Sequence, residues 1–228
     1  MAKHLPGGEM SSRILDFIWI ADCSGSMDGE KIQTLNYAIR QVIPDMQKEA
    51  DANPNASVMV RALKFSDGAQ WHIPTAMPID QFSWQDLQAG GVTSMGTALE
   101  MVAVELRSFP ADTKRLPPVL VLLTDGQPTD EFKKGLDDLM GTPWGKKAVR
   151  IAIAIGKDAD LDVLEQFTGN RELVLEAKNP QLLIQFIKWA STVVKTVSSP
   201  RATEDGTAPS GVDLNTVPVL SDDDDEIW

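Results

Sequence analysis

The chain has 228 residues, 43% of them hydrophobic, and a formal net charge of −12 at pH 7. A chain of this size can bury a sizeable core, and its negative charge, with no basic stripe, argues against nucleic acid as a partner. The single cysteine, Cys23, excludes an intrachain disulfide and a thiolate metal cluster. No apolar run reaches the roughly 18 residues that span a bilayer, so we expect a cytoplasmic protein without membrane contact.

Apolar runs alternate with helical patterns along the chain. The predicted strands span residues 14–21, 57–65, 69–73, 119–124, 148–155 and 172–176. The predicted helices span residues 30–50, with a kink at Pro44, 96–109, 130–140, 161–167 and 181–195. This order predicts an α/β fold, with a doubly wound, Rossmann-like, mostly parallel sheet of six strands, one antiparallel edge strand and helices on both faces.

Composition divides the chain into three parts. We predict a flexible arm over residues 1–12, a folded domain over 13–196 and a disordered acidic tail over 197–228, where eight acidic residues meet one basic residue. An acidic tail commonly serves solubility alone, but terminal apolar residues are typical interface anchors. The residues predicted to dock on a partner, or on a metal site, are Asp222, Asp223, Asp224, Asp225, Glu226, Ile227 and Trp228.

The most informative motif follows the first predicted strand. In the run DCSGSM, Asp22, Ser24 and Ser26 alternate directly after the apolar residues 17–21. Carboxylate and hydroxyl oxygens suit hard cations, and Mg²⁺ takes such ligands in an octahedral shell that keeps several waters. The spacing lets three side chains converge on one ion, although the pattern alone is weak evidence.

Two later segments bring oxygen-bearing side chains to the same edge of the sheet. Asp125 directly follows the apolar run 119–124, and Thr93 lies between two glycines and a helical pattern. In open α/β sheets, ligands bind at the carboxyl ends of strands, near the point where strand order reverses. We therefore expect the loops after the first and fourth strands to meet, with Thr93 at the same rim.

Each segment also has an ordinary structural explanation. Ser24 and Ser26 are typical helix caps, as are Thr93 and Ser94 before the next helix. Asp125 begins a common turn sequence, DGQP. The joint occurrence of the three segments in this order favours a metal site.

The segments DCSGSM, GGVTSMGTAL and LLTDGQPTD resemble the three loops of the metal-ion-dependent adhesion site of von Willebrand factor A domains. The resemblance implies that Ser24 and Ser26 bind a metal through their hydroxyls and that Thr93 binds it directly or through water. It also implies that Asp22 and Asp125 hold metal-bound waters. The implied cation is Mg²⁺, with Mn²⁺ and Ca²⁺ as alternatives.

The resemblance further implies how the site is used. Since no protein carboxylate binds the metal directly, one coordination position is left for an Asp or Glu side chain of a partner protein. The second loop is similar to that of the TerY group, bacterial proteins linked to tellurium resistance and stress response. Members of this group often work beside a protein kinase and a phosphatase, which the resemblance implies as partners here.

Three classes of function are compared. The leading one is a metal-dependent protein-interaction module in the bacterial cytoplasm, and the alternative is a substrate adaptor for an AAA-type ATPase of the MoxR or chelatase kind. An enzyme is disfavoured because the three loops offer no general base near the metal. The two histidines, His4 and His72, form no catalytic constellation.

Two further residues receive structural explanations. Asp160 stands in an alternating acidic run that lacks the Gly and Glu of a calcium loop, so it is predicted to cap a helix. Cys23 is predicted to point into the core as a small hydrophobic side chain.

Overall fold

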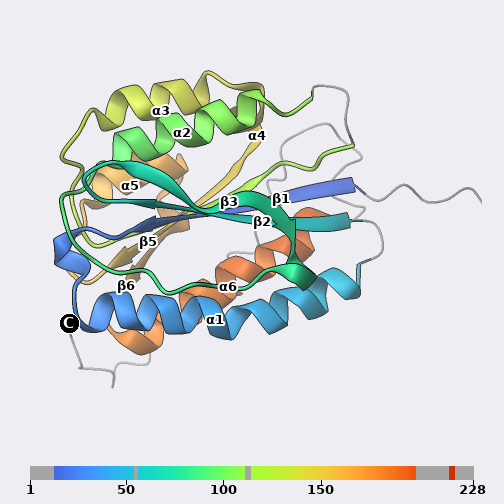
Figure 1. Ribbon diagram of the computed structural model, residues 1–228, viewed down its shortest axis with the longest axis horizontal. Coiled ribbons are helices and arrows are strands. Elements are labelled where there is room, and N and C mark those ends of the chain that lie inside the picture. Colours follow the sequence, from blue (N-terminus) through green and yellow to red (C-terminus); the bar gives the residue numbers. More distant parts are fainter. Residues whose placement is uncertain (1–12, 54–55, 111–113, 199–215, 219–228) are drawn as a thin grey trace, which may run out of the picture.

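The computed structural model describes residues 13–53, 56–110, 114–198 and 216–218 (Figure 1). Within these ranges six strands form one sheet, in the order β3-β2-β1-β4-β5-β6. The strands are β1 (Arg13–Asp22), β2 (Ala56–Phe65), β3 (Ala69–Pro78), β4 (Val119–Thr124), β5 (Val149–Ile155) and β6 (Val174–Ala177). The helices are α1 (Glu30–Asp51), α2 (Met95–Arg107), α3 (Phe132–Met140), α4 (Pro143–Lys147), α5 (Leu161–Thr168) and α6 (Pro180–Ser198).

The pairing of the strands confirms the predicted fold class. β1 pairs in parallel with β2 and β4, and β5 continues the parallel sheet from β4 to β6. β3 pairs with β2 in the antiparallel direction at the edge. The chain leaves β1 toward β3 and then returns to β4, so strand order reverses between β1 and β4, where a doubly wound sheet places its ligand site.

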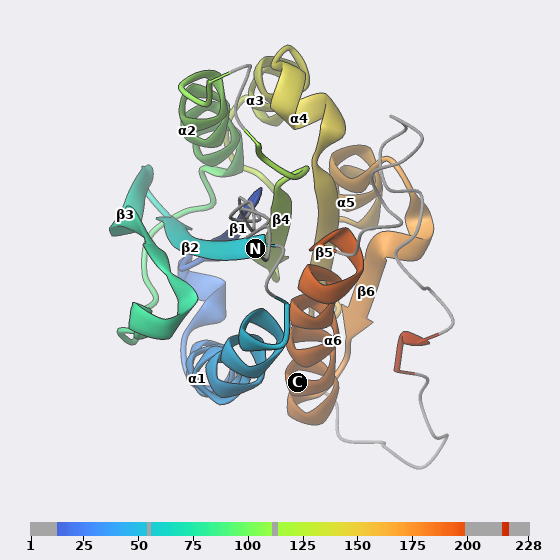
Figure 2. The ribbon, with the colours of Figure 1, turned by 90° about the vertical axis from the view of Figure 1, so that its right-hand side faces the viewer.

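Helices cover both faces of the sheet (Figure 2). α1 and α6 contribute to one buried cluster, and α2, α3 and α5 contribute to the other. Because both faces are covered, the central strands need no alternation of polar and apolar residues, and all six residues of β4 are buried. The uninterrupted apolar runs of the sequence are a direct result of this burial.

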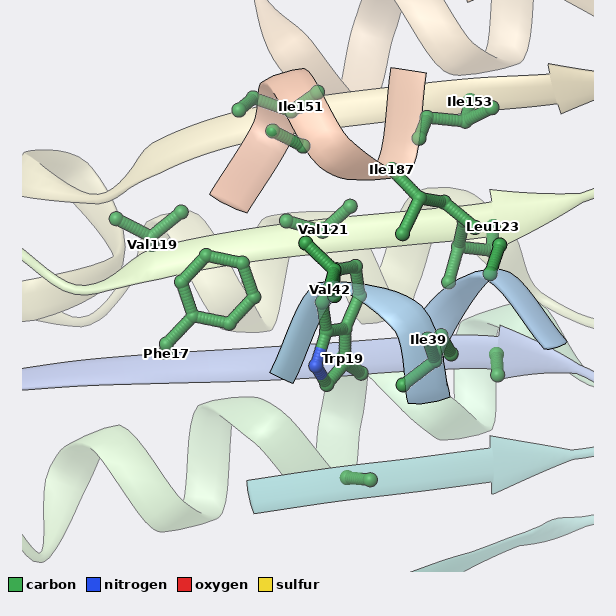
Figure 3. Packing of buried hydrophobic residues seen from close by; sticks show 14 of the residues in the cluster. Phe17, Trp19, Ile39, Val42, Val119, Val121, Leu123, Ile151, Ile153 and Ile187 are labelled. Carbon is green, nitrogen blue, oxygen red and sulfur yellow. The ribbon is translucent and has the colours of Figure 1, made fainter. Parts of the chain in front are cut away.

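Alternate residues of the central strands form the core beneath α1 and α6. Figure 3 shows Trp19 of β1 and Val121 of β4 on the same face, covered by Val42 of α1 and Ile187 of α6. Trp19 packs edge-on against Phe17, with 4.8 Å between the ring centroids. This layer fixes the positions of β1 and β4, whose carboxyl ends carry the predicted metal loops.

The observed elements differ from the predicted ones mainly at their ends. α1 continues through Pro44 as predicted and ends one residue later, at Asp51, whereas β3 extends to Pro78 instead of ending at residue 73. The short helix α4 and the 3₁₀ turns η1 (Gly25–Met27), η2 (Ile79–Gln81) and η3 (Arg171–Leu173) were not predicted. Each spans at most five residues, too few for a periodic pattern to show.

α6 ends at Ser198, beyond the predicted limit of the folded domain at residue 196. Residues 216–218, also predicted as tail, contact this helix. Trp189 Nε1 donates a hydrogen bond to Thr216 Oγ1 at 3.0 Å, and Val217 packs against the core. The predicted arm at 1–12 and the predicted docking residues 222–228 lie outside the described residues.

α2 and α3 approach each other through two glycines. A Cβ on Gly135 would lie 2.2 Å from the carbonyl oxygen of Gly96, and a Cβ on Gly96 would lie 2.6 Å from the carbonyl oxygen of Glu131. Contacts this short are excluded for any other residue, so only glycine permits the observed helix separation. α2 follows the Thr93 loop and α3 follows the Asp125 loop, so this contact sets the two loops relative to each other.

We expect Gly135→Ala to lower the free energy of unfolding by about 1–3 kcal/mol, because the added methyl group forces the backbones apart. Helix propensity alone predicts the opposite sign, a gain of about 1 kcal/mol. Urea unfolding followed by circular dichroism measures the change. Gly68→Ala is the control, since its Cβ meets no atom within 4 Å. A Gly135→Ala variant as stable as the parent would contradict the close approach.

Candidate metal centre

The five predicted ligand residues lie on three loops at the carboxyl edge of the sheet. Asp22 ends β1, Ser24 and Ser26 follow it around η1, and Asp125 comes directly after β4. Thr93 lies just before α2. β1 and β4 are hydrogen-bonded neighbours, so their carboxyl ends bring the first and third loops together as expected.

Hydrogen bonds link the side chains of the first and third loops. Ser24 Oγ and Ser26 Oγ lie 3.0 Å apart, and Ser26 Oγ donates to Asp125 Oδ1 at 2.7 Å. Asp22 accepts from the Ser24 amide at 2.7 Å and from the Thr124 hydroxyl. Four of the five predicted residues therefore form one continuous polar cluster.

Thr93 faces this cluster across Gly126. A Cβ on Gly126 would lie 3.4 Å from Thr93 Oγ1 and 3.8 Å from Ser26 Oγ. The Thr93 backbone is held by Thr129, which receives a hydrogen bond from the Thr93 amide at 3.1 Å and returns one to its carbonyl at 2.9 Å. All five residues thus meet at one place, with glycine at the point of closest approach.

The site carries buried negative charge. The Asp22 and Asp125 residues are both fully buried. Burial raises the pKa of the Asp22 carboxyl above its ordinary value, and the charge of Asp125 adds to the rise, while hydrogen bonds from Thr124 and Ser24 oppose it. Lys31 Nζ contacts Asp125 Oδ2 at 2.6 Å. One ammonium beside two carboxylates leaves a local deficit of positive charge that a cation would fill.

The donor set fits a hard divalent cation. Among the described residues no group of three or more His, Cys, Asp or Glu side chains is arranged to hold a metal. A metal at this cluster would therefore depend on the hydroxyls of Ser24, Ser26 and Thr93, with the carboxylates close by. Oxygen ligands supplemented by water are what Mg²⁺ prefers, whereas Zn²⁺ sites are usually built from nitrogen and sulfur.

Ser24, Ser26 and Ser94 do not act as helix caps, which was the alternative explanation for these residues. α1 begins at Glu30, after Gly29, and neither η1 nor α1 receives a hydrogen bond from a capping side chain. Ser94 precedes α2 without a capping hydrogen bond from its side chain. The hydroxyls of Ser24 and Ser26 contact each other and Asp125 instead of helix amides.

The cap of α2 comes from a residue that the sequence analysis did not single out. Asp130 Oδ1 accepts from the Gly96 amide at 2.7 Å, and Oδ2 accepts from both the amide and the hydroxyl of Thr97 at 2.8 Å. In the sequence Asp130 looks like the start of the following helix, which begins instead at Phe132. Its carboxylate joins the third loop to the second.

We expect Asp130→Ala to lower the free energy of unfolding by about 1–2 kcal/mol, since the amides at the start of α2 lose their acceptor. Chemical denaturation measures the loss. Asp158→Ala, at an exposed position in the loop between β5 and α5, is the control and should change stability by less than about 0.5 kcal/mol. Equal effects of the two substitutions would show that the Asp130 bridge contributes nothing.

Two structural predictions are confirmed at other positions. Asp160 caps α5 by accepting from the amides of Asp162 and Val163. Cys23 is 3% exposed and belongs to the core cluster beneath α1. Burial raises the pKa of the Cys23 thiol to about 12, and the negative charge of Asp22 adds to the rise.

Cys23 should therefore react slowly with a disulfide reagent such as DTNB. At pH 8 we expect native protein to label at least about a hundredfold more slowly than protein unfolded in guanidinium, because the thiolate is the reactive species. Absorbance of the released thionitrobenzoate follows the reaction. Native and unfolded rates within a factor of about ten would contradict the buried, protonated thiol.

A family model of the von Willebrand factor type A domain matches residues 16–189, which is most of the chain. The chain belongs to this family. The family that the sequence resembles, hereafter VWA, is therefore confirmed, whereas neither a complete metal site nor a relation to the TerY group follows from this match. A search of curated proteins finds no match to the sequence.

Solved structures show the same VWA fold. A von Willebrand factor type A protein from Catenulispora acidiphila is similar with a TM-score of 0.60 and 18% identity, over 82% of this chain and 43% of that chain. The pilus adhesin SpaC from Lactobacillus rhamnosus GG is similar with a TM-score of 0.64 and 14% identity, over 81% of this chain and 31% of that chain. Proximal thread matrix protein 1 of the mussel byssus was solved with zinc in its MIDAS motif, the metal-ion-dependent adhesion site. It is similar with a TM-score of 0.54 and 17% identity, over 80% of this chain and 47% of that chain.

The VWA chain spans less than half the length of these three structures. At such low identity the likeness shows the fold alone. Among the described residues, no helix combines the length and apolar character needed to cross a membrane.

Proposed function

We propose that this VWA domain is a metal-dependent protein-interaction module of the cytoplasm, which binds an Asp or Glu side chain of a partner protein. The observation that carries the proposal is the meeting of five oxygen-bearing side chains from three loops, in which the fully buried Asp22 and Asp125 lie beside Ser24, Ser26 and Thr93. VWA domains generally serve as protein-interaction modules.

In this proposal Ser24 and Ser26 hold Mg²⁺ through their hydroxyls, Thr93 binds directly or through water, and Asp22 and Asp125 orient bound waters. When bound, the cation supplies positive charge for a partner carboxylate, which makes a stronger contact than a neutral group would. The zinc-occupied site of the byssus protein supports a divalent cation at sites of this kind. The chemistry of oxygen donors favours magnesium here, with manganese and calcium as alternatives.

We further propose that the module works in a bacterial stress-response or signalling system with kinase and phosphatase partners, and that it is not an enzyme. The similarity of the second loop, GGVTSMGTAL, to TerY proteins supports the first part. The second part is supported by the composition of the cluster, in which both carboxylates are fully buried and are assigned here to metal-bound waters, not to proton transfer. The alternative partner remains an AAA-type ATPase.

Mg²⁺ at about one hundred times its dissociation constant should stabilise the protein by about 2.7 kcal/mol. We expect the double variant Ser24→Ala, Ser26→Ala to lose this gain, because two hydroxyl ligands are removed. Thermal unfolding with EDTA or with a Mg²⁺ series measures the effect. Ser57→Ala, at an exposed position at the opposite end of the sheet, should keep the full gain. A double variant that is stabilised by Mg²⁺ as much as the parent would contradict the proposed ligand set.

Partner capture should depend on the same cation. From a cell lysate we expect the intact protein to retain its partner in Mg²⁺, to release it in EDTA, and to fail to bind it as the Asp22→Ala variant. A retained kinase or phosphatase would support the signalling assignment, and a retained ATPase would support the adaptor assignment. Recovery of the same proteins in all three conditions would mean that the cation plays no part in binding.

A further inference from the structure

Lys31 occupies a position that the family pattern does not assign. It lies in the first turn of α1, and its Nζ is 2.6 Å from Asp125 Oδ2. The side chain of Lys31 is 15% exposed, and that of Asp125 is 0% exposed. The other oxygen of Asp125 accepts from the Ser26 hydroxyl. Both oxygens of this carboxylate are therefore engaged within the protein.

A divalent cation and the Lys31 ammonium make conflicting demands on Asp125. The proposed metal site needs this carboxylate for a metal-bound water, but the ammonium already neutralises it through a charge-assisted hydrogen bond. A divalent cation together with the ammonium would bring three positive charges to the two buried carboxylates, Asp22 and Asp125, one more than they can neutralise. Little solvent is present to screen the repulsion between the cation and the ammonium. Entry of the metal thus requires the ammonium to withdraw.

The local structure allows this withdrawal. Lys31 follows Gly29, which has a φ of 82°, and Glu30, which is exposed, so the first turn of α1 lies at the surface. The next buried residue, Ile32, is 6% exposed and belongs to the core. A lysine has a long, flexible stem and a strongly hydrated charge. Its ammonium can therefore reach solvent by rotation of the side chain while α1 stays packed.

We propose that Lys31 is an internal competitor of the divalent cation. Its ammonium neutralises Asp125 when no metal is bound and leaves when the metal enters. The inference rests on the proposed metal site. As a consequence, the site binds metal more weakly than the same ligands would without Lys31. The metal-free protein in turn keeps the buried carboxylate of Asp125 neutralised.

The test is the dissociation constant of Mg²⁺ for the full chain, measured by isothermal titration calorimetry. We expect Lys31→Met to bind at least tenfold more tightly than the parent, a difference of about 1.4 kcal/mol. Lys31→Arg keeps the charge and should stay within threefold of the parent. Lys48→Met removes the same charge from the last turn of α1 and is the matched control, also expected within threefold.

Thermal unfolding distinguishes competition from a purely structural role. In EDTA, Lys31→Met should melt at a lower temperature than the parent, because Asp125 is left buried without its counter-ion. Its gain in melting temperature on adding Mg²⁺ should exceed that of the parent. A structural role alone predicts the loss in EDTA without the larger gain.

The outcomes separate this inference from the metal site itself. Equal or weaker Mg²⁺ binding by Lys31→Met, with a normal response of the parent, would overturn the competition and leave the site standing. Absence of binding by both proteins would overturn the site and the competition together. Binding by Lys31→Met alone would support the competition in its strongest form.

Discussion

The buried carboxylate of Asp125 is the constraint on which the functional edge of this protein depends. A buried charge is tolerated only when it is paired and hydrogen-bonded, and Asp125 meets this condition through groups from two other segments, Ser26 and Lys31. Residues that are 99 and 94 positions apart in the chain are thereby held together. Unless another cation takes the place of the Lys31 ammonium, the first loop, the start of α1 and the end of β4 cannot separate without leaving Asp125 unpaired.

Two backbone hydrogen bonds join the first loop to the second. The amide of Gly25 donates to the carbonyl of Gly91 at 2.9 Å, and the amide of Gly90 donates to the carbonyl of Cys23 at 2.8 Å. These two bonds attach the loop that carries Thr93 to the loop that carries the serines. A Cβ on Gly25 would lie 3.4 Å from the carbonyl oxygen of Gly91, an ordinary van der Waals distance, so the two hydrogen bonds, not a lack of space, fix this approach. Main-chain hydrogen bonds therefore hold the hydroxyls of the serines and of Thr93 close to each other.

Much of this organisation was predictable from the sequence, and the remainder has physical reasons for being hidden. Buried parallel strands leave uninterrupted apolar runs such as 119–124, and the strand ends then place Asp22 and Asp125 at one edge. Asp130 and Lys31 were missed because their partners are distant in the chain. Locally, each looks like an ordinary residue at a helix start. The spacing of residues along the sequence predicts helices and strands, but it does not predict a contact between separate loops. The metal-binding roles themselves stay predictions.

The contact between Gly96 and Gly135 has a consequence for motion. Side chains normally form a compliant layer between helices and absorb small displacements by changing rotamer, but here main-chain atoms touch directly. α2 and α3 are therefore expected to shift as a single rigid unit. Any displacement of the Thr93 loop or the Asp125 loop is therefore expected to move both helices along their whole length, because neither helix can slide or tilt on its own without a collision of backbones.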